Sequence, residues 1–276
     1  MEAKLAEKRA ALDERLRALG SVVVAFSGGV DSALLLKVAV QVLGPDKVLA
    51  VTGRSPSVPS AELDSVATLA AEIGAPHEFV DTAEFDDPDY VANPVNRCYF
   101  CKSELYAKLV PLAATRGYAA VLSGTNADDL GDFRPGLRAA DEQRVHAPLA
   151  EVGIRKSELR TIAAQVGLSI HDKPASPCLS SRIPYGEDVT PEKLARIDAA
   201  ETFLRALGFR ECRVRHHAAL ARIEVPVAEM GRFGDAALRE QVARRLRELG
   251  FQYATLDLAG FRSGSLNEVL PGPGLA

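Results

Sequence analysis

Short apolar runs alternate with longer helical segments through the first half of the chain. SVVVAF (residues 21–26) is typical of a buried parallel strand, DSALLLKVAVQVLG (31–44) of a helix, and KVLAVTG (47–53) of a second strand. Helices are predicted over residues 61–73 and after Cys101, and strands at HEFVDT and AAVLSG. Strands that alternate with helices form right-handed βαβ units. The pattern predicts an α/β fold with a doubly wound parallel sheet that binds ligands at the carboxyl ends of its strands.

The pattern changes after HDKPASPCLSSRIPYGEDVT (residues 171–190), whose Pro, Ser and Gly content is typical of a loop or linker. Thr190 is a candidate N-cap, with Pro191 at the first position of a helix that runs to Gly208. Two strands, a helix ending at Gly250 and a last strand then predict a smaller α+β domain. The expected organisation is a nucleotide-binding domain at 1–175, a cysteine-bearing loop at 176–190, and a C-terminal α+β domain at 191–276.

Composition excludes several classes of protein. With 276 residues, 47% of them hydrophobic and 25% charged, the chain is long enough for two globular domains. Its net charge of -4 gives no electrostatic argument for nucleic acid as a partner, although a local basic patch remains compatible with it. The first twenty residues are charged throughout, unlike a signal peptide, and no apolar run approaches the roughly 18 residues of a membrane span. We therefore expect a cytoplasmic protein with no membrane partner.

The segment SGGVDS lies between the first predicted strand and the helix that follows it. Glycines expose backbone N–H groups at a helix N-terminus, where the helix dipole favours an anion. The two serines add hydroxyl donors, and the aspartate can hold Mg²⁺. An ordinary strand-to-helix turn would account for the glycines alone, but the whole set favours a phosphate site. The residues expected to bind the nucleotide here are Ser27, Gly28, Gly29, Val30, Asp31 and Ser32.

This segment lacks the GKS or GKT of a Walker A loop and instead resembles the PP-loop of the ATP pyrophosphatase superfamily. Members of that superfamily cleave ATP between the α- and β-phosphates and transfer AMP to an acceptor oxygen. The later SGTNADDLGDFRPG (residues 123–136) resembles the superfamily's second nucleotide-binding segment. The resemblance implies that Gly124 and Thr125 bind nucleotide and that Asp129 assists Asp31 in holding Mg²⁺. A solvated acidic turn is the alternative for Asp128 and Asp132.

Two of the four cysteines, Cys98 and Cys101, form a CxxC pair in RCYFCK. In a reducing compartment such a pair indicates metal or redox chemistry rather than a structural disulfide. Three interpretations follow from the residues: thiols without a metal, a redox dithiol, or a structural zinc site with His171 or Cys212 as a further ligand. The redox dithiol is disfavoured, because this CxxC does not open the first helix of a thioredoxin-like unit.

The segment DKPASPCLSSRIPYGEDVT, together with RCYFCK, SGTNADDLGDFRPG and RVRHH, resembles the LarE family over nearly the whole chain. LarE proteins are sulfur transferases of nickel-pincer nucleotide synthesis. The resemblance implies that ATP adenylates a carboxylate of pyridinium-3,5-biscarboxylic acid mononucleotide and that sulfur then replaces AMP, giving a thiocarboxylate. Holding the sulfur nucleophile in place would remove much of the entropic barrier.

The family has two branches that differ in the source of sulfur. One sacrifices a single cysteine of the CLSSR loop, and the other ligates a [4Fe-4S] cluster through CxxC and the loop cysteine. Cys98, Cys101 and Cys178 match the second branch, so the resemblance implies a cluster whose open iron could carry an exogenous sulfide from a sulfur donor. A sacrificial Cys178 is the alternative within the same reaction.

Two features of the predicted C-terminal domain are candidates for substrate binding. The strand period of two places Arg213 and Arg215 on one face, where they could bind a phosphate or carboxylate, and leaves Cys212 to pack inward. Glu201 occupies an apolar helical stripe. A solvated strand face and a helix-edge glutamate are the structural alternatives.

The resemblance favours a functional interpretation of these residues, because LarE proteins use a glutamate and an RxR pair around a substrate-phosphate or metal site. It implies a catalytic role for Glu201 and substrate contacts for Ser181, Arg182, Arg213 and Arg215. It also implies assembly into hexamers. The alternatives in function are a tRNA thiolase, an NAD-synthetase-like amidating enzyme, which has no use for CxxC, and a non-catalytic nucleotide-binding module.

Overall fold

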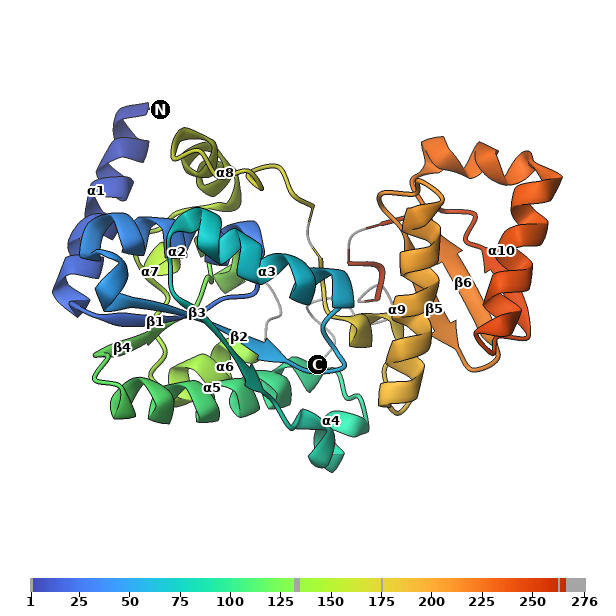
Figure 1. Cartoon of the computed structure of the whole chain (residues 1–276), viewed down its shortest axis with the longest axis horizontal. Coiled ribbons are helices and arrows are strands. Elements are labelled where there is room, and N and C mark those ends of the chain that lie inside the picture. Colours follow the sequence, from blue (N-terminus) through green and yellow to red (C-terminus); the bar gives the residue numbers. More distant parts are fainter. Residues whose placement is uncertain (1, 132–134, 175, 263, 267–276) are drawn as a thin grey trace. The chain divides into compact units, whose positions relative to one another are not determined.

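The computed structural model of the chain, drawn in Figure 1, contains two compact units. Unit 1 consists of Met1–Ser55, Ala61–Tyr90 and Pro94–Ser176, and unit 2 of Pro56–Ser60, Val91–Asn93 and Pro177–Ala276. The structure describes residues 2–131, 135–174, 176–262 and 264–266. Asp132, one of the acidic residues of the second nucleotide segment, lies outside the described residues.

Unit 1 is built on a four-stranded parallel sheet in the order β3-β2-β1-β4. Val22 of β1 lies opposite Val48 of β2 on one side and opposite Ala120 of β4 on the other. The strands are β1 (Val22–Ala25), β2 (Val48–Arg54), β3 (His77–Asp81) and β4 (Ala120–Leu122). The predicted α/β class with a parallel sheet is confirmed.

Helices cover both faces of this sheet (Figure 1), and β1, β2 and β4 are largely buried on both sides, whereas β3 is only partly buried. Val22 and Val24 face one buried cluster with residues of α1, α2, α3 and α8, while Val23 faces a second cluster with residues of α5 and α6. The helices are α1 (Glu2–Leu19), α2 (Val30–Leu43), α3 (Ser60–Ile73), α4 (Pro88–Val91), α5 (Arg97–Thr115), α6 (Gly136–Glu142), α7 (Pro148–Glu151) and α8 (Lys156–Gln165). Short 3-10 turns are η1 (Pro45–Lys47), η2 (Glu84–Asp86) and η3 (Ala127–Gly131).

Helix α5 begins earlier than the sequence pattern predicted. It starts at Arg97 rather than after Cys101, with Asn96 as its N-cap. The segment contains no glycine and no proline before Pro111, so nothing in it opposes a helix across the CxxC pair. Among the described residues no helix combines the length and the apolar character that crossing a membrane would require.

Unit 2 contains a three-stranded sheet in the order β5-β6-β7, with β5 and β6 antiparallel and β6 and β7 parallel. Thr190 caps the helix that leads into it, as predicted, because its hydroxyl accepts a hydrogen bond from the N–H of Lys193 (3.3 Å). Cys212 and Val214 pack with Phe209 in the core, which confirms the inward packing of Cys212. The elements are η4 (Leu179–Arg182), α9 (Pro191–Ala206), β5 (Arg213–His217), β6 (Leu220–Glu224), η5 (Val227–Gly234), α10 (Ala236–Glu248) and β7 (Tyr253–Leu256).

Candidate active site

The SGGVDS segment forms the turn between β1 and α2 in unit 1. Gly28 has a φ of +70°, a conformation that glycine adopts without strain, and Gly29 is the N-cap of α2. The hydroxyl of Ser32 donates to the carbonyl of Gly29 (3.1 Å) and accepts from the N–H of Ser27 (3.2 Å). Gly29 has no side chain that could cap the N–H groups in the first turn of α2, so these N–H groups can bind an anion.

The second nucleotide segment packs directly against this turn. A Cβ added to Gly124 would lie 2.8 Å from the backbone nitrogen of Ser32, so only glycine permits this approach. The buried Asn126 then joins the two expected magnesium ligands. Its side-chain amide donates to Asp31 Oδ1 (3.2 Å), and its backbone N–H donates to Asp129 Oδ2 (3.0 Å). Asn126 was not singled out from the sequence, although it lies inside the quoted segment.

Two lysines that the sequence analysis missed contact the same turn. Lys156 forms an ion pair with Asp31, and its backbone N–H donates to Asp128 Oδ2 (2.8 Å). Lys173 donates to the carbonyl of Gly28 (3.3 Å). Both lysines come from segments more than 120 residues away in the chain, so no local pattern could have identified them. Their positive charges suit a site for polyphosphate.

The CxxC pair lies in the first two turns of α5, also in unit 1. Cys98 is exposed and Cys101 half-buried, and their spacing of three residues places them on one side of the helix. The end of the second nucleotide segment packs here, because a Cβ on Gly136 would lie 3.4 Å from the carbonyl oxygen of Cys98. The nucleotide segment and the CxxC helix are therefore neighbours.

The third cysteine, Cys178, belongs to unit 2 and precedes the turn η4. Its side chain is half-buried. Its carbonyl oxygen accepts three hydrogen bonds, from the N–H of Ser181 (3.0 Å), the hydroxyl of Ser181 (2.8 Å) and Nη1 of Arg182 (2.9 Å). The N–H of Leu179 donates to the carbonyl of Ser57 (2.8 Å). The backbone on both sides of the thiol is therefore held by the protein.

Glu201 is completely buried in unit 2, so the helix-edge alternative is wrong. Its carboxylate accepts from Nε (2.8 Å) and Nη2 (3.0 Å) of Arg182, from Nη2 of Arg205 (2.8 Å) and from the N–H of Val214 (3.1 Å). Burial alone would raise the pKa of Glu201, but the charge and hydrogen bonds of Arg182, assisted by Arg213, outweigh it and hold the pKa below its ordinary value. Glu201 is therefore a buried carboxylate that orients Arg182.

Arg213 and Arg215 are both buried, which overturns the alternative of a solvated strand face. Arg215 makes a bidentate pair with Glu224, at 2.9 Å for each hydrogen bond, and donates to the carbonyl of Ser181 (2.7 Å). Arg213 lies over the ring of Phe261, and burial lowers its pKa to about 10, aided by the nearby Arg182 charge. At neutral pH the Arg213 guanidinium therefore stays protonated.

No three His, Cys, Asp or Glu side chains gather as metal ligands in the part of the chain that the structure describes. Cys98 and Cys101 belong to unit 1 and Cys178 to unit 2. None of these cysteines forms a disulfide. The three-cysteine ligand set therefore stays a prediction.

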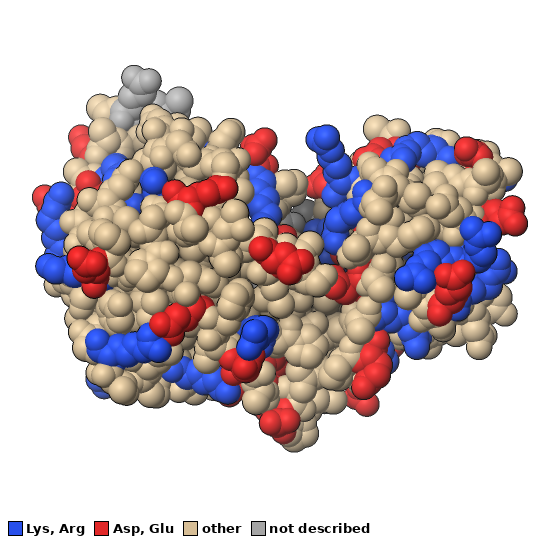
Figure 2. Space-filling model, in the orientation of Figure 1, with Lys and Arg blue, Asp and Glu red and all other residues tan. Residues whose placement is uncertain are grey.

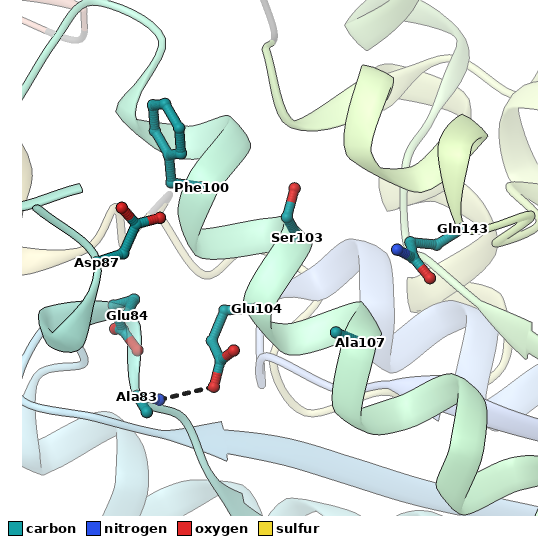
Figure 3. A pocket seen from close by; sticks show the side chains of 8 residues that line it. All are labelled: Ala83, Glu84, Asp87, Phe100, Ser103, Glu104, Ala107 and Gln143. Atoms are coloured by element: carbon teal, nitrogen blue, oxygen red, sulfur yellow. Dashed lines mark hydrogen bonds between the residues drawn. The ribbon is translucent and has the colours of Figure 1, made fainter. Parts of the chain in front are cut away.

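A separate cavity of about 310 Å³ lies along α5 in unit 1 (Figure 3). Phe100, Ser103, Glu104 and Ala107 line it at helical spacing, so it lies on a side of α5 other than that of the CxxC pair. The Glu104 carboxylate that faces it already accepts from the N–H of Ala83 (2.8 Å). The remaining lining residues are Glu84, Asp87 and Gln143. This cavity is not part of the nucleotide site.

Comparisons with known proteins agree with this geometry. The sequence model of the asparagine synthase family matches residues 7–172. An uncharacterized protein from Synechocystis sp. is 49% identical over 98% of this chain and 99% of its own length. Pyridinium-3,5-bisthiocarboxylic acid mononucleotide synthase from Lactiplantibacillus plantarum is 42% identical over 97% of this chain and 96% of its own length. An uncharacterized protein from Methanocaldococcus jannaschii is 28% identical over 88% of this chain.

Proposed function

Because this chain belongs to the LarE family of ATP-dependent sulfurtransferases, we propose that it converts carboxylates of pyridinium-3,5-biscarboxylic acid mononucleotide into thiocarboxylates. The observation that carries this proposal is the 42% identity, over 97% of the chain, to a synthase named for the bis-thiocarboxylic product. The PP-loop geometry of unit 1 supports the ATP-dependent half of the reaction.

The first half-reaction activates the carboxylate. A carboxylate oxygen is a poor leaving group, so the carboxylate must first be activated. One of its oxygens attacks the α-phosphorus of ATP, the α–β phosphoanhydride bond breaks, and pyrophosphate leaves. We assign pyrophosphate to the first turn of α2, where backbone N–H groups can donate to it. The hydroxyls of Ser27 and Ser32 would donate to it after releasing their present partners. Lys156 and Lys173 add positive charge beside that turn. The nucleotide would also contact Gly124 and Thr125.

Mg²⁺ would be held by Asp31 and Asp129. Carboxylate oxygens and phosphate oxygens are the ligands that this ion prefers. The two aspartates fit, because Asn126 hydrogen-bonds to both and keeps them beside the same turn. Lys156 shares the Asp31 carboxylate, so it would have to release this oxygen when the ion binds.

The second half-reaction delivers sulfur to the acyl carbon, from which AMP leaves with the electrons of the broken bond. The donor set of Cys98, Cys101 and Cys178 fits a [4Fe-4S] cluster, since all are thiols outside disulfides and the first two share one side of α5. With three protein ligands, such a cluster would supply sulfur at its fourth iron. The protein's own contribution at Cys178 is to hold the backbone on both sides of the thiol.

We further propose that the C-terminal domain, 191–276, binds the substrate and mediates assembly into a hexamer. Arg213 and Ser181 are assigned to the substrate's phosphate or carboxylate. Arg182 and Arg215 already donate to backbone carbonyls of the Cys178 loop, so they would act on the substrate through that loop. Acidic and basic side chains are intermixed on the face drawn in Figure 2, which gives no support to a tRNA substrate.

The test uses protein purified without oxygen. We expect wild type to hold about four irons per chain with acid-labile sulfide, and to release AMP and pyrophosphate while the pyridinium nucleotide gains sulfur. Cys98→Ala should lose the iron, while Cys212→Ala, a buried cysteine outside the ligand set, should keep it. Iron-free wild type that stops after one turnover, with Cys178 stripped of its sulfur, would favour the sacrificial mechanism. Sulfur transfer to tRNA but not to the pyridinium nucleotide would overturn the proposed substrate.

A further inference from the structure

The two peptide planes that flank Cys178 are both bound by one nitrogen of Arg182. Nη1 of Arg182 donates to the carbonyl of Pro177 (2.7 Å), which precedes the Cα of Cys178, and to the carbonyl of Cys178 itself (2.9 Å). The orientations of these two planes determine φ and ψ of Cys178, which are −57° and 152°. With both angles held, only rotation about χ1 remains to direct the thiol.

Arg182 is held in turn by Glu201. The guanidinium is completely buried, and its Nε and Nη2 donate to the two carboxylate oxygens of Glu201 at 2.8 and 3.0 Å. The hydroxyl oxygen of Ser181 also lies 2.9 Å from Nη1, so the two hydrogens of Nη1 are shared among three acceptors. In this conformation the edges of the guanidinium contact protein atoms, so it cannot also bind a substrate phosphate without leaving the loop.

A buried ion pair of this kind is weak evidence for stability, since desolvation opposes the attraction between the charges. The pair does fix the orientation of the Arg182 guanidinium, because a planar guanidinium with two hydrogen bonds to a carboxylate has little freedom to rotate. A second pair, Arg215 with Glu224, holds the carbonyl of Ser181 on the same turn (2.7 Å). Two buried Arg–Glu pairs therefore converge on the backbone beside one half-buried thiol.

We propose that Arg182, oriented by Glu201, is a positioning residue that fixes the backbone and the Cα–Cβ direction of Cys178 for sulfur transfer, an inference that rests on the proposed function. It replaces the substrate contact implied for Arg182 and the direct catalytic role implied for Glu201. Both residues act through the backbone of the cysteine loop rather than by touching the reacting atoms.

The test removes both charges of the Arg182–Glu201 pair and leaves Arg213, which is buried near Glu201, in place. In the double variant Arg182→Met, Glu201→Gln, the glutamine can still accept from the N–H of Val214, and methionine approximates the stem of the arginine. The matched control is Arg205→Met. Arg205 donates to the same carboxylate (2.8 Å) but makes no hydrogen bond to the Cys178 loop among the described contacts.

Two measurements are made on each full-length protein: amide hydrogen exchange of the peptide 177–183 and steady-state sulfur transfer. For the double variant we expect exchange of this peptide about ten-fold faster or more. We expect kcat to fall about 100-fold, with KM for ATP within about two-fold of wild type, because the nucleotide loop belongs to unit 1. Arg205→Met should change neither exchange nor kcat by more than about two-fold.

Each other outcome has a definite meaning. A fall in kcat with unchanged exchange of residues 177–183 would show that Arg182 acts otherwise than by holding the loop, and would overturn the proposal. Faster exchange with unchanged kcat would also overturn it, since an ordered loop would then be unnecessary. If wild type transfers no sulfur to the pyridinium nucleotide, the proposed function fails, while the exchange data still report whether Arg182 orders the loop. A double variant that does not fold is replaced by Arg182→Lys, for which the same pair of changes is expected with smaller size.

Discussion

The close approach of Gly124 to the nucleotide turn allows a quantitative prediction. In Gly124→Ala the new Cβ would lie 2.8 Å from the backbone nitrogen and 2.9 Å from the Cα of Ser32, where ordinary contact begins at 3.4 Å. Both atoms belong to the backbone, so no side chain can rotate away. The second nucleotide segment or the turn must therefore move by about 0.6 Å, the difference between the shortest contact and an ordinary one.

This displacement falls on the atoms assigned to pyrophosphate. Overpacking of this kind lowers the free energy of unfolding by about 1–3 kcal/mol. A misplacement of about 1 Å can reduce a rate about 100-fold, so we expect pyrophosphate release to slow by between about 10- and 100-fold. The iron content should not change, because the three atoms nearest to the added Cβ belong to Asp31 and Ser32 and not to the CxxC pair.

The assay is ATP-dependent release of pyrophosphate, with urea unfolding of each variant in parallel. Gly131→Ala is the control, because Gly131 lies in the same segment, has no atom within 4 Å of an added Cβ and does not have a positive φ. We expect Gly131→Ala to keep the wild-type rate. If Gly124→Ala also releases pyrophosphate at the wild-type rate, the assignment of this turn to the phosphates is refuted.

Three further predictions concern titratable groups. Asp31→Asn keeps the size of the side chain but removes its charge, so the Mg²⁺ concentration for half-maximal pyrophosphate release should rise about ten-fold or more. No change in that concentration would argue against Asp31 as a ligand. Burial and the neighbouring Glu201 charge raise the pKa of the Cys212 thiol to about 11, so iodoacetamide at pH 8 should modify it about 100-fold more slowly in native than in urea-unfolded protein, as measured by mass spectrometry. Burial, assisted by the positive charges of Lys193 and Arg196, lowers the pKa of His216 to about 4 from an ordinary 6.5. Between these two pKa values His216 is protonated in the unfolded chain but neutral in the folded protein, so a fall in pH favours unfolding. The free energy of unfolding should then drop by about 2 kcal/mol between pH 7 and pH 5 from this group, and His216→Leu should lose that part of the drop in urea titrations.

The layered architecture of unit 1 follows from local patterns. The strands β1 and β2 are short runs rich in β-branched residues, and several of the helices have an apolar period. In unit 2, a short-range contact, the Thr190 cap, determines where α9 begins. The early start of α5 was missed because local sequence alone does not determine it. Cysteine and aromatic residues have weak helix propensity, and packing against α6 supplies what the local sequence does not.

The candidate site was only partly predictable. Glu201 could be recognised as a misfit in an apolar stripe, but its partner Arg182 lies 19 residues away in a segment expected to be a loop. The antiparallel pairing of β5 with β6 places Arg213 opposite Glu224 and buries both arginines of the RxR pair. A strand period of two shows which side chains share a face, but it does not show whether that face is covered.

The sequence by itself therefore determined the fold class, the family and the activation chemistry, because motifs such as SGGVDS and CxxC act through neighbours a few residues apart. Only the tertiary structure decided which cations meet the phosphate turn and how the Cys178 backbone is held. Lys156 reaches Asp31 across 125 residues, and Arg215 reaches Ser181 across 34. The physical reason is that the partner of a charged side chain depends on which distant segments the fold brings together. A local sequence pattern does not contain that information.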